Sequence, residues 1–256
     1  MGNSAAFITY ATDLENPVFR VLSHDFAKTG HQLVLVPPYE PLHARAFDLW
    51  TRWRIHNRLA FHLGRRLYAL RRFLDGLDED VVVCFLDSYD LVLVGDPGTI
   101  VERFRASGVE LLFGGELNVY PARELRADYA RHGYSPERKQ FPFLNGGTWV
   151  GYAGAVLRRL RENRFNVVVN DQEYWSEVFL RERDRGLATF EIDADAELFV
   201  NTWGLDLERD LAWVGGRLEC RRTGTSPAVV HFNGRREDSL PFIEARDAAL
   251  AGQTHR

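Results

Sequence analysis

Two aspartates that stand three residues apart after an apolar run are the sharpest chemical feature of the sequence. The run 81–86 leads directly into Asp87, and Asp90 follows after a serine and a tyrosine. A buried parallel strand delivers the residues after it to the carboxyl edge of a sheet, where open α/β folds bind ligands. Carboxylates there suit Mg²⁺ or Mn²⁺, which would neutralise a diphosphate leaving group as a Lewis acid. An acidic turn without function has the same pattern, because aspartate favours turns.

A glycine pair after an asparagine is the second feature. Asn145, Gly146 and Gly147 come directly before a strand predicted over 148–152. Glycine lets the backbone approach a ligand closely, which makes this segment a candidate binding loop. Asn-Gly-Gly also forms ordinary turns, so the segment alone does not decide between the two interpretations.

Two more polar groups follow apolar runs later in the chain. Asn170 and Asp171 come after the run 167–169, where a helix is predicted to begin, so Asp171 is either a functional carboxylate or a helix N-cap. His231 ends a predicted strand, and a glycine and two arginines stand behind it. Imidazole is the commonest nitrogen ligand of divalent ions, although a lone histidine at a strand end is more often structural.

Alternating strands and helices must position these residues, because short apolar runs alternate with longer helical patterns along the chain. Helical patterns cover 59–74 and 98–106, so the first half consists of β-α-β units. The strands are predicted at 5–11, 32–36, 81–86, 110–113, 148–152, 189–192 and 229–232. The pattern predicts an α/β fold. Since no linker or internal repeat is visible, we expect one domain over 1–240 and a C-terminal helix or tail over 241–256.

The composition indicates a globular protein with no global attraction to nucleic acid or membranes. The chain has 256 residues, 45% of them hydrophobic, and 32 basic against 36 acidic side chains give a net charge of −4. No apolar run approaches the length of about twenty residues that a membrane span needs. Two cysteines, Cys84 and Cys220, cannot form a disulfide framework, and no basic segment precedes the first apolar stretch. We therefore expect a cytoplasmic protein.

One basic segment departs from this balance. Between Arg45 and Arg72 there are eight arginines against one acid, Asp48, with aromatic residues between them. The ordinary interpretation is a solvated helix face beside a core stripe. The alternative is a surface for an anionic acceptor or for donor phosphates.

In their order and spacing, the motifs resemble those of one known family. It comprises the glycosyltransferase domain of the multifunctional procollagen lysyl hydroxylases and the related collagen hydroxylysine glycosyltransferases. The matching motifs are Asp-Ser-Tyr-Asp at 87–90, Leu-Asn-Gly-Gly at 144–147, Asp-Gln at 171–172 and His-Phe-Asn-Gly at 231–234. The strand end at Glu116, followed by Tyr120-Pro121, is similar to the family's acidic strand end and Trp-Pro.

The resemblance runs from about Ile8 to about Arg236, which is nearly the whole chain. It implies a GT-A fold, which is a Rossmann-like α/β domain with a mixed, mostly parallel central sheet. Such a domain binds a nucleotide-sugar and a manganese ion. The family's run of aspartates before the glutamine is reduced here to Asp171 with Asn170 beside it.

The same resemblance implies a role for each motif residue. Asp87, Asp90 and His231 would bind Mn²⁺ or Mg²⁺, and Tyr89 would stack on uracil with Tyr39 on the other face of the base. Arg66 and one of two late arginines would replace lysines of the family at the donor. The donor-binding residues would be Tyr10, Ala11, Thr12, Tyr39, Arg66, Tyr89, Asn145, Gly146, Gly147, Gly234, Arg235 and Arg236. The catalytic or acceptor-binding residues would be Glu116, Asn170 and Asp171.

The implied function is transfer of a hexose from UDP-glucose or UDP-galactose to an acceptor hydroxyl. One alternative is a nucleotide-sugar binder that has lost activity. Another is a sugar nucleotidyltransferase, although the glycine-rich basic loop that such an enzyme has after its first strand is missing from 9–15. The acceptor stays open among a hydroxylysine-like residue, a glycan and a hydroxymethylpyrimidine in DNA. The basic segment favours DNA, and the negative net charge opposes it.

Overall fold

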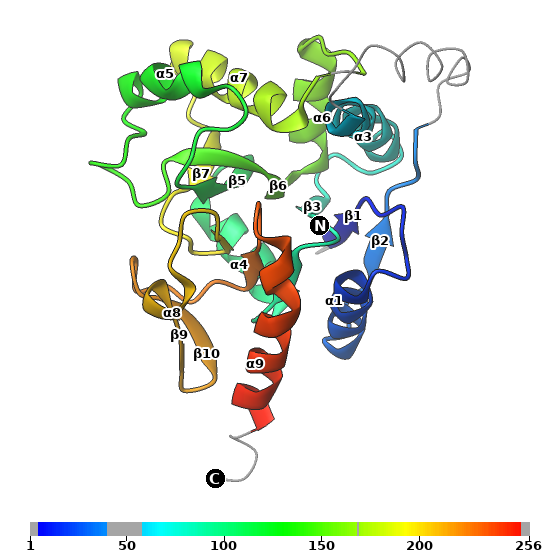
Figure 1. Cartoon of the computed structure of the whole chain (residues 1–256). Helices are drawn as coiled ribbons and strands as arrows, with labels where there is room; N and C mark the ends of the chain where they lie inside the picture. The colour runs from blue at the N-terminus through cyan, green and yellow to red at the C-terminus, as the bar shows by residue number, and fades with distance from the viewer. Residues whose placement is uncertain (1–4, 40–57, 168, 252–256) are drawn as a thin grey trace.

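A six-stranded sheet with helices on both faces forms the centre of the computed structural model (Figure 1). The structure describes residues 5–39, 58–167 and 169–251, with side chains from residue 64 onward in the second range. The strand order is β2 (Leu33–Leu35), β1 (Ala5–Thr9), β3 (Val82–Leu86), β6 (Phe143–Tyr152), β5 (Leu111–Glu116) and β7 (Phe190–Asp193). β6 runs antiparallel to both neighbours, and the other pairs are parallel. The predicted α/β fold with a mixed, mostly parallel sheet is therefore confirmed.

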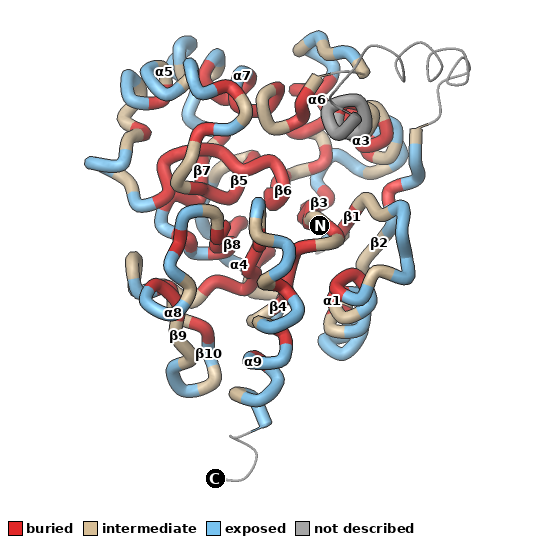
Figure 2. Tube along the Cα trace, in the orientation of Figure 1, coloured by how far each residue is buried: buried red, intermediate tan, exposed pale blue. Residues whose placement is uncertain are grey.

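Helices cover the sheet from both sides because β3 is apolar on both of its faces. α3 (Arg58–Leu74), α6 (Ala153–Glu162) and α7 (Asp171–Asp184) share one core cluster with Val83 of β3. α1 (Pro17–Lys28) and α4 (Pro97–Ser107) share the opposite cluster with Val82. Successive strand residues point to opposite faces, so a strand buried on both faces appears as the continuous apolar run seen in the sequence. Figure 2 shows these strands buried beneath helices whose outer turns are exposed.

A smaller, three-stranded sheet beside the first pairs a strand from the middle of the chain with two strands from its last quarter. Its order is β4 (Leu91–Leu93), β11 (Val229–His231) and β8 (Phe199–Asn201), with β11 antiparallel to β4 and parallel to β8. The four residues between β3 and β4 therefore connect the two sheets. The sequence predicted β11 but neither β4 nor β8, whose positions depend on their pairing with β11.

The remaining elements lie outside the six-stranded and three-stranded sheets. They are η1 (Arg123–Leu125), α5 (Arg126–Arg131), α8 (Leu207–Asp210), β9 (Leu211–Val214), β10 (Arg217–Cys220), η2 (Arg236–Asp238) and α9 (Ser239–Ala251). The buried Arg246 of α9 donates hydrogen bonds to Asp25 of α1 and to the Leu93 carbonyl of β4. The expected C-terminal helix is thus present, begins at Ser239 and packs on the domain. Cys84 and Cys220 are both buried and free. No helix in the described ranges has the length and apolarity to cross a membrane.

Candidate functional site

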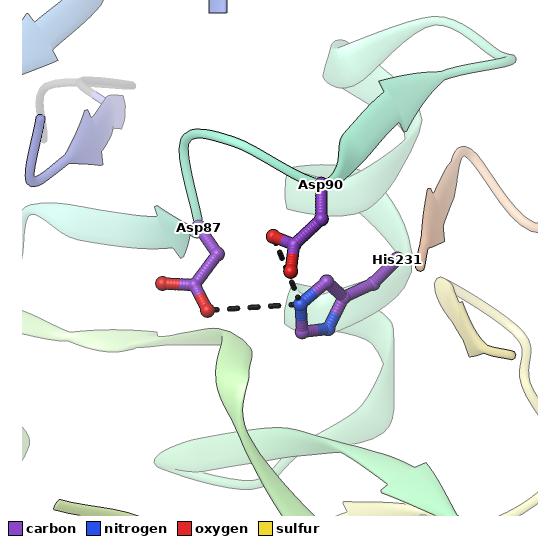
Figure 3. Close-up of side chains that lie close together, drawn as sticks. All are labelled: Asp87, Asp90 and His231. Carbon is purple, nitrogen blue, oxygen red and sulfur yellow. Dashed lines mark ion pairs between the residues drawn. The ribbon is translucent and has the colours of Figure 1, made fainter. Parts of the chain in front are cut away.

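Asp87, Asp90 and His231 converge where the two sheets meet (Figure 3). Asp87 follows β3, Asp90 precedes β4, and His231 ends β11 opposite Leu91 in the register of the small sheet. The His231 Nε2 atom lies 3.6 Å from Asp87 Oδ2 and 3.5 Å from Asp90 Oδ1. One ligand atom from each residue lies within 4.8 Å of the other two. The topology therefore brings together residues that are up to 144 positions apart, from Asp87 to His231.

The donor set and its spacing fit a divalent cation. Ligand atoms about 2.1 Å from an ion at tetrahedral or octahedral angles lie about 3.0 to 3.4 Å from one another. The two His231 distances, 3.5 and 3.6 Å, are close to that range, so small side-chain rotations would complete the geometry. Two carboxylates and one imidazole leave further coordination positions for oxygens of a substrate. Asp90 and His231 are buried, whereas Asp87 is partly exposed, so a ligand can approach from the Asp87 side.

A bulge in β6 forms the wall of this site. Between the pairs Phe113–Trp149 and Gly115–Leu144, β5 contributes one residue and β6 contributes four, 145–148. The extra residues bend β6 away from β5. The Gly147 carbonyl then accepts a hydrogen bond from the Asp87 N–H at 2.8 Å. Asn145, Gly146 and Gly147 therefore lie within β6 and are not a turn before it, which corrects the predicted strand start at residue 148.

Arg66 of α3 forms ion pairs with Asp87 and Asp171. Its guanidinium donates to Asp87 Oδ1, lies 3.5 Å from Asp171 Oδ2, and stands 5.0 Å from the centre of the Phe85 ring. Although burial opposes its charge, Asp87 and Asp171 hold the pKa of Arg66 above its usual value. Arg66 is therefore a largely buried cation next to the candidate metal ligands.

Asp171 is not the N-cap of α7. The cap is Asn170, whose side-chain oxygen accepts hydrogen bonds from the N–H groups of Gln172 and Glu173 at 2.9 and 3.2 Å. Burial raises the pKa of the Asp171 carboxyl to about 6, while Arg66 acts to lower it. Asp171 thus lies in the first turn of α7, and its carboxylate pairs with Arg66. The capping role that the sequence analysis considered for Asp171 belongs to Asn170.

Glu116 lies beneath the site at the end of β5 and is 1% exposed. Its oxygens accept hydrogen bonds from the side-chain amides of Gln172, Asn233 and Asn145, the last two at 2.8 and 3.4 Å. Burial raises the pKa of Glu116 to about 8, in spite of these three donors. Glu116 therefore joins β5, β6, α7 and the segment after β11 in one polar network. Gln172 and Asn233 were not predicted as site residues, although both stand within the matching motifs.

Tyr89 is fixed by the loop after β1. Its hydroxyl accepts hydrogen bonds from the backbone N–H groups of Thr12 and Asp13 at 2.5 and 2.6 Å. Next to it, the Ser88 hydroxyl donates to the Tyr10 carbonyl at 3.0 Å. The segment 10–12, which the sequence predicted to bind the nucleotide, thus lies next to Tyr89. Thr12 and Tyr89 are 77 positions apart in the chain.

The other predicted donor-binding residues differ in their positions. Arg236 lies 3.7 Å from Asp90 Oδ2 and 5.6 Å from the centre of the Tyr89 ring, whereas Arg235 pairs with Asp238. Arg236 is therefore the arginine that reaches the site. The Tyr39 ring stacks on Tyr68 of α3 with centroids 5.1 Å apart, so a place opposite Tyr89 stays a prediction.

Gly234, another predicted donor-binding residue, adopts a φ of +70°, which favours glycine, and it packs against Trp203.

In the basic segment, residues 45–57 lie outside the described residues, and so do the side chains of 58–63. Asn201 of β8 was not predicted at all, yet its side chain contacts the His231 ring.

Comparison with known proteins places the chain among glycosyltransferase domains. A family model described as the PLOD GT domain matches residues 52–245. The chain is 31% identical to procollagen-lysine,2-oxoglutarate 5-dioxygenase of Drosophila melanogaster over 161 residues, which cover 61% of this chain and 22% of that protein. It is 29% identical to the human multifunctional procollagen lysine hydroxylase and glycosyltransferase LH3 over 167 residues, which cover 64% of this chain and 22% of that protein. The chain thus spans about a quarter of the length of the curated relatives it matches.

A solved structure supports the fold independently of sequence. A glycosyltransferase involved in the glycosylation of the major capsid of PBCV-1 superposes with a TM-score of 0.50 at 10% sequence identity. The superposition covers 93% of this chain and 98% of that one. At this identity the likeness concerns the fold alone. It confirms the GT-A fold that the motifs imply.

Proposed function

Since the chain belongs to the PLOD glycosyltransferase domain family, we propose that it transfers a hexose from a UDP-sugar to an acceptor hydroxyl with the aid of a divalent cation. The observation that carries the proposal is the convergence of Asp87, Asp90 and His231. These residues would hold Mn²⁺ or Mg²⁺. When bound there, the cation would neutralise the negative charge that develops on the diphosphate as the sugar leaves.

The chain's own residues offer the donor two further contacts. Tyr89 presents a partly buried ring whose hydroxyl is anchored by two backbone N–H groups, which suits stacking on a uracil base. Arg236 lies beside both the Tyr89 ring and Asp90, so its guanidinium would be close to the donor phosphates. We expect UDP-glucose or UDP-galactose as the donor.

Asp171 is the carboxylate best placed to act on the sugar or the acceptor. It lies across Arg66 from Asp87, and with a pKa of about 6 it is mostly ionised at neutral pH. An ionised carboxylate can accept a hydrogen bond or a proton from a hydroxyl. Asn170 is occupied as the helix cap and Glu116 is buried in the amide network, so we assign them to positioning.

For the acceptor, we favour a hydroxyl on a hydroxylysine-like side chain. Two relatives carry names that refer to procollagen lysine, whereas the net charge of −4 opposes binding to DNA. A glycan hydroxyl would need the same chemistry and is an outcome of the test. A cytoplasmic location stays a prediction.

The test offers UDP-glucose and UDP-galactose with Mn²⁺ to a hydroxylysyl peptide, a matched lysyl peptide, simple sugars and hydroxymethylated DNA. Mass spectrometry then identifies which acceptor gains a hexose. We expect transfer to the hydroxylysyl peptide and none to the lysyl peptide. Binding of UDP-sugar with no transfer to any acceptor would favour the inactive binder. Binding of neither UDP nor UDP-sugar would contradict the proposal.

A further inference from the structure

Asn201 forms a hydrogen-bonded relay with the ring of His231. The two residues are partners in the parallel register of β8 and β11, so their side chains lie on the same face of the small sheet. The Nδ1 atom of His231 lies 2.7 Å from Asn201 Oδ1, and Asn201 is 0% exposed. The contact is therefore excluded from water and fixed by two strands.

The orientation of the Asn201 amide follows from its second partner. Its Nδ2 atom donates a hydrogen bond to the Gly115 carbonyl at 2.8 Å, and a carbonyl can only accept. The oxygen of the amide must then face His231. Because an amide oxygen cannot donate, the His231 Nδ1 atom must carry the hydrogen of this bond.

A second amide gives the same result. Asn145 Oδ1 accepts a hydrogen bond from the Gly147 N–H at 2.9 Å, which fixes that oxygen, and it lies 3.1 Å from His231 Nδ1. Two oxygens thus face Nδ1 from β6 and β8. With its hydrogen on Nδ1, a neutral His231 ring directs the lone pair of Nε2 toward Asp87 and Asp90.

From this relay we infer that Asn201 is a positioning residue for the metal site, and the inference rests on the proposed function. The Asn201 amide links the Gly115 carbonyl to the His231 ring, and it holds that ring in the tautomer and orientation in which Nε2 binds the cation. Outer partners of metal-binding histidines typically change metal affinity by about 10- to 100-fold. Asn201 is the cleaner residue to change, since Asn145 also contacts Gly147 and Glu116.

The experiment measures Mn²⁺ binding to the whole chain by electron paramagnetic resonance, without donor or acceptor. Asn201→Leu removes the acceptor at nearly constant volume and should weaken Mn²⁺ binding by about 10- to 100-fold. Asn201→Asp keeps an oxygen facing Nδ1 and should bind Mn²⁺ more tightly than Asn201→Leu. Pulsed measurements should detect nitrogen coordination of Mn²⁺ in wild type and its loss in Asn201→Leu. If Asn201→Leu does not fold, Asn201→Val, which is smaller and suits a strand, serves in its place.

Thr202→Val is the matched control. Thr202 is equally buried and donates its hydroxyl to the His231 carbonyl, so it contacts the same residue without touching the ring. This variant should keep wild-type Mn²⁺ affinity. Equal affinities in wild type and Asn201→Leu would overturn the inference and leave the proposed function standing. A wild-type protein that binds no Mn²⁺ would contradict the proposed metal site, and the inference about Asn201 with it.

Discussion

Gly147 stands so close to His231 that no side chain fits between them. A Cβ atom at Gly147 would lie 2.4 Å from His231 Cε1 and 2.6 Å from Asp87 Oδ2. Neither neighbour moves easily, because amides hold the His231 ring and Arg66 binds Asp87. The absence of a side chain at Gly147 is therefore a condition for the convergence of two proposed metal ligands.

Gly147→Ala should separate these ligands and weaken Mn²⁺ binding about tenfold or more, as losing a ligand's support does. Paramagnetic resonance or calorimetry measures the affinity. Gly76→Ala is the control, since the nearest heavy atom to a Cβ there is the Phe73 carbonyl oxygen at 3.5 Å. Unchanged Mn²⁺ affinity in a folded Gly147→Ala protein would be inconsistent with this geometry.

Tyr89→Ala should weaken UDP binding about tenfold or more, because stacking on an aromatic ring is worth about 1 to 3 kcal/mol per base. Tyr89→Phe keeps the ring but loses the hydrogen bonds from Thr12 and Asp13, so it should have a smaller effect. Calorimetric titration of UDP in the presence of Mn²⁺ measures both. If Tyr89→Ala lowered the melting temperature and left UDP affinity unaltered, Tyr89 would be a structural aromatic only.

Asp171→Asn should lower the transfer rate by about 100-fold or more, which is the typical contribution of a group that activates a hydroxyl. The helix should persist, because Asn170 supplies its cap. Asn170→Ala is the complementary variant and should cost about 1 kcal/mol of unfolding free energy. Initial rates with saturating donor, together with thermal unfolding, separate the two roles. Near-normal transfer by Asp171→Asn would remove Asp171 from the chemistry.

The ion pair between Arg159 and Glu182 should stabilise the fold without affecting the site. Arg159 is 2% exposed, and its Nε and Nη2 atoms each lie 2.8 Å from an oxygen of Glu182. Glu182→Gln leaves that guanidinium with Glu110 as its remaining charged partner and should cost about 3 kcal/mol of unfolding free energy. Denaturant unfolding measures this cost. A change in Mn²⁺ affinity at moderate temperature would contradict the separation of the pair from the site.

The sequence predicted the parts of this fold whose burial leaves a periodic or continuous apolar pattern. β3 is buried on both faces, so it was visible as an apolar run, and it correctly placed Asp87 at the edge of the sheet. α3 was visible through its leucine spacing. Neither the antiparallel direction of β6 nor its bulge could be predicted, because direction depends on tertiary pairing and glycine is unfavourable in strands.

The polar partners beneath the site could be predicted only where a motif contained them. Gln172 and Asn233 stand beside motif residues, so their place near the site was within reach of the sequence. Asn201 follows a three-residue apolar stretch, 198–200, and stands 30 positions from His231. Its role depends on the pairing of β8 with β11, and no local pattern in the sequence carries that information.

Titration of UDP into the protein, with Mn²⁺ and then with EDTA, tests the central claim most directly. If Asp87, Asp90 and His231 hold a cation that binds the donor diphosphate, UDP should bind wild type in Mn²⁺ and fail to bind in EDTA. Asp90→Asn should then bind UDP poorly under both conditions. UDP affinity that is the same in Mn²⁺ and in EDTA, or the same in wild type and Asp90→Asn, would contradict the account.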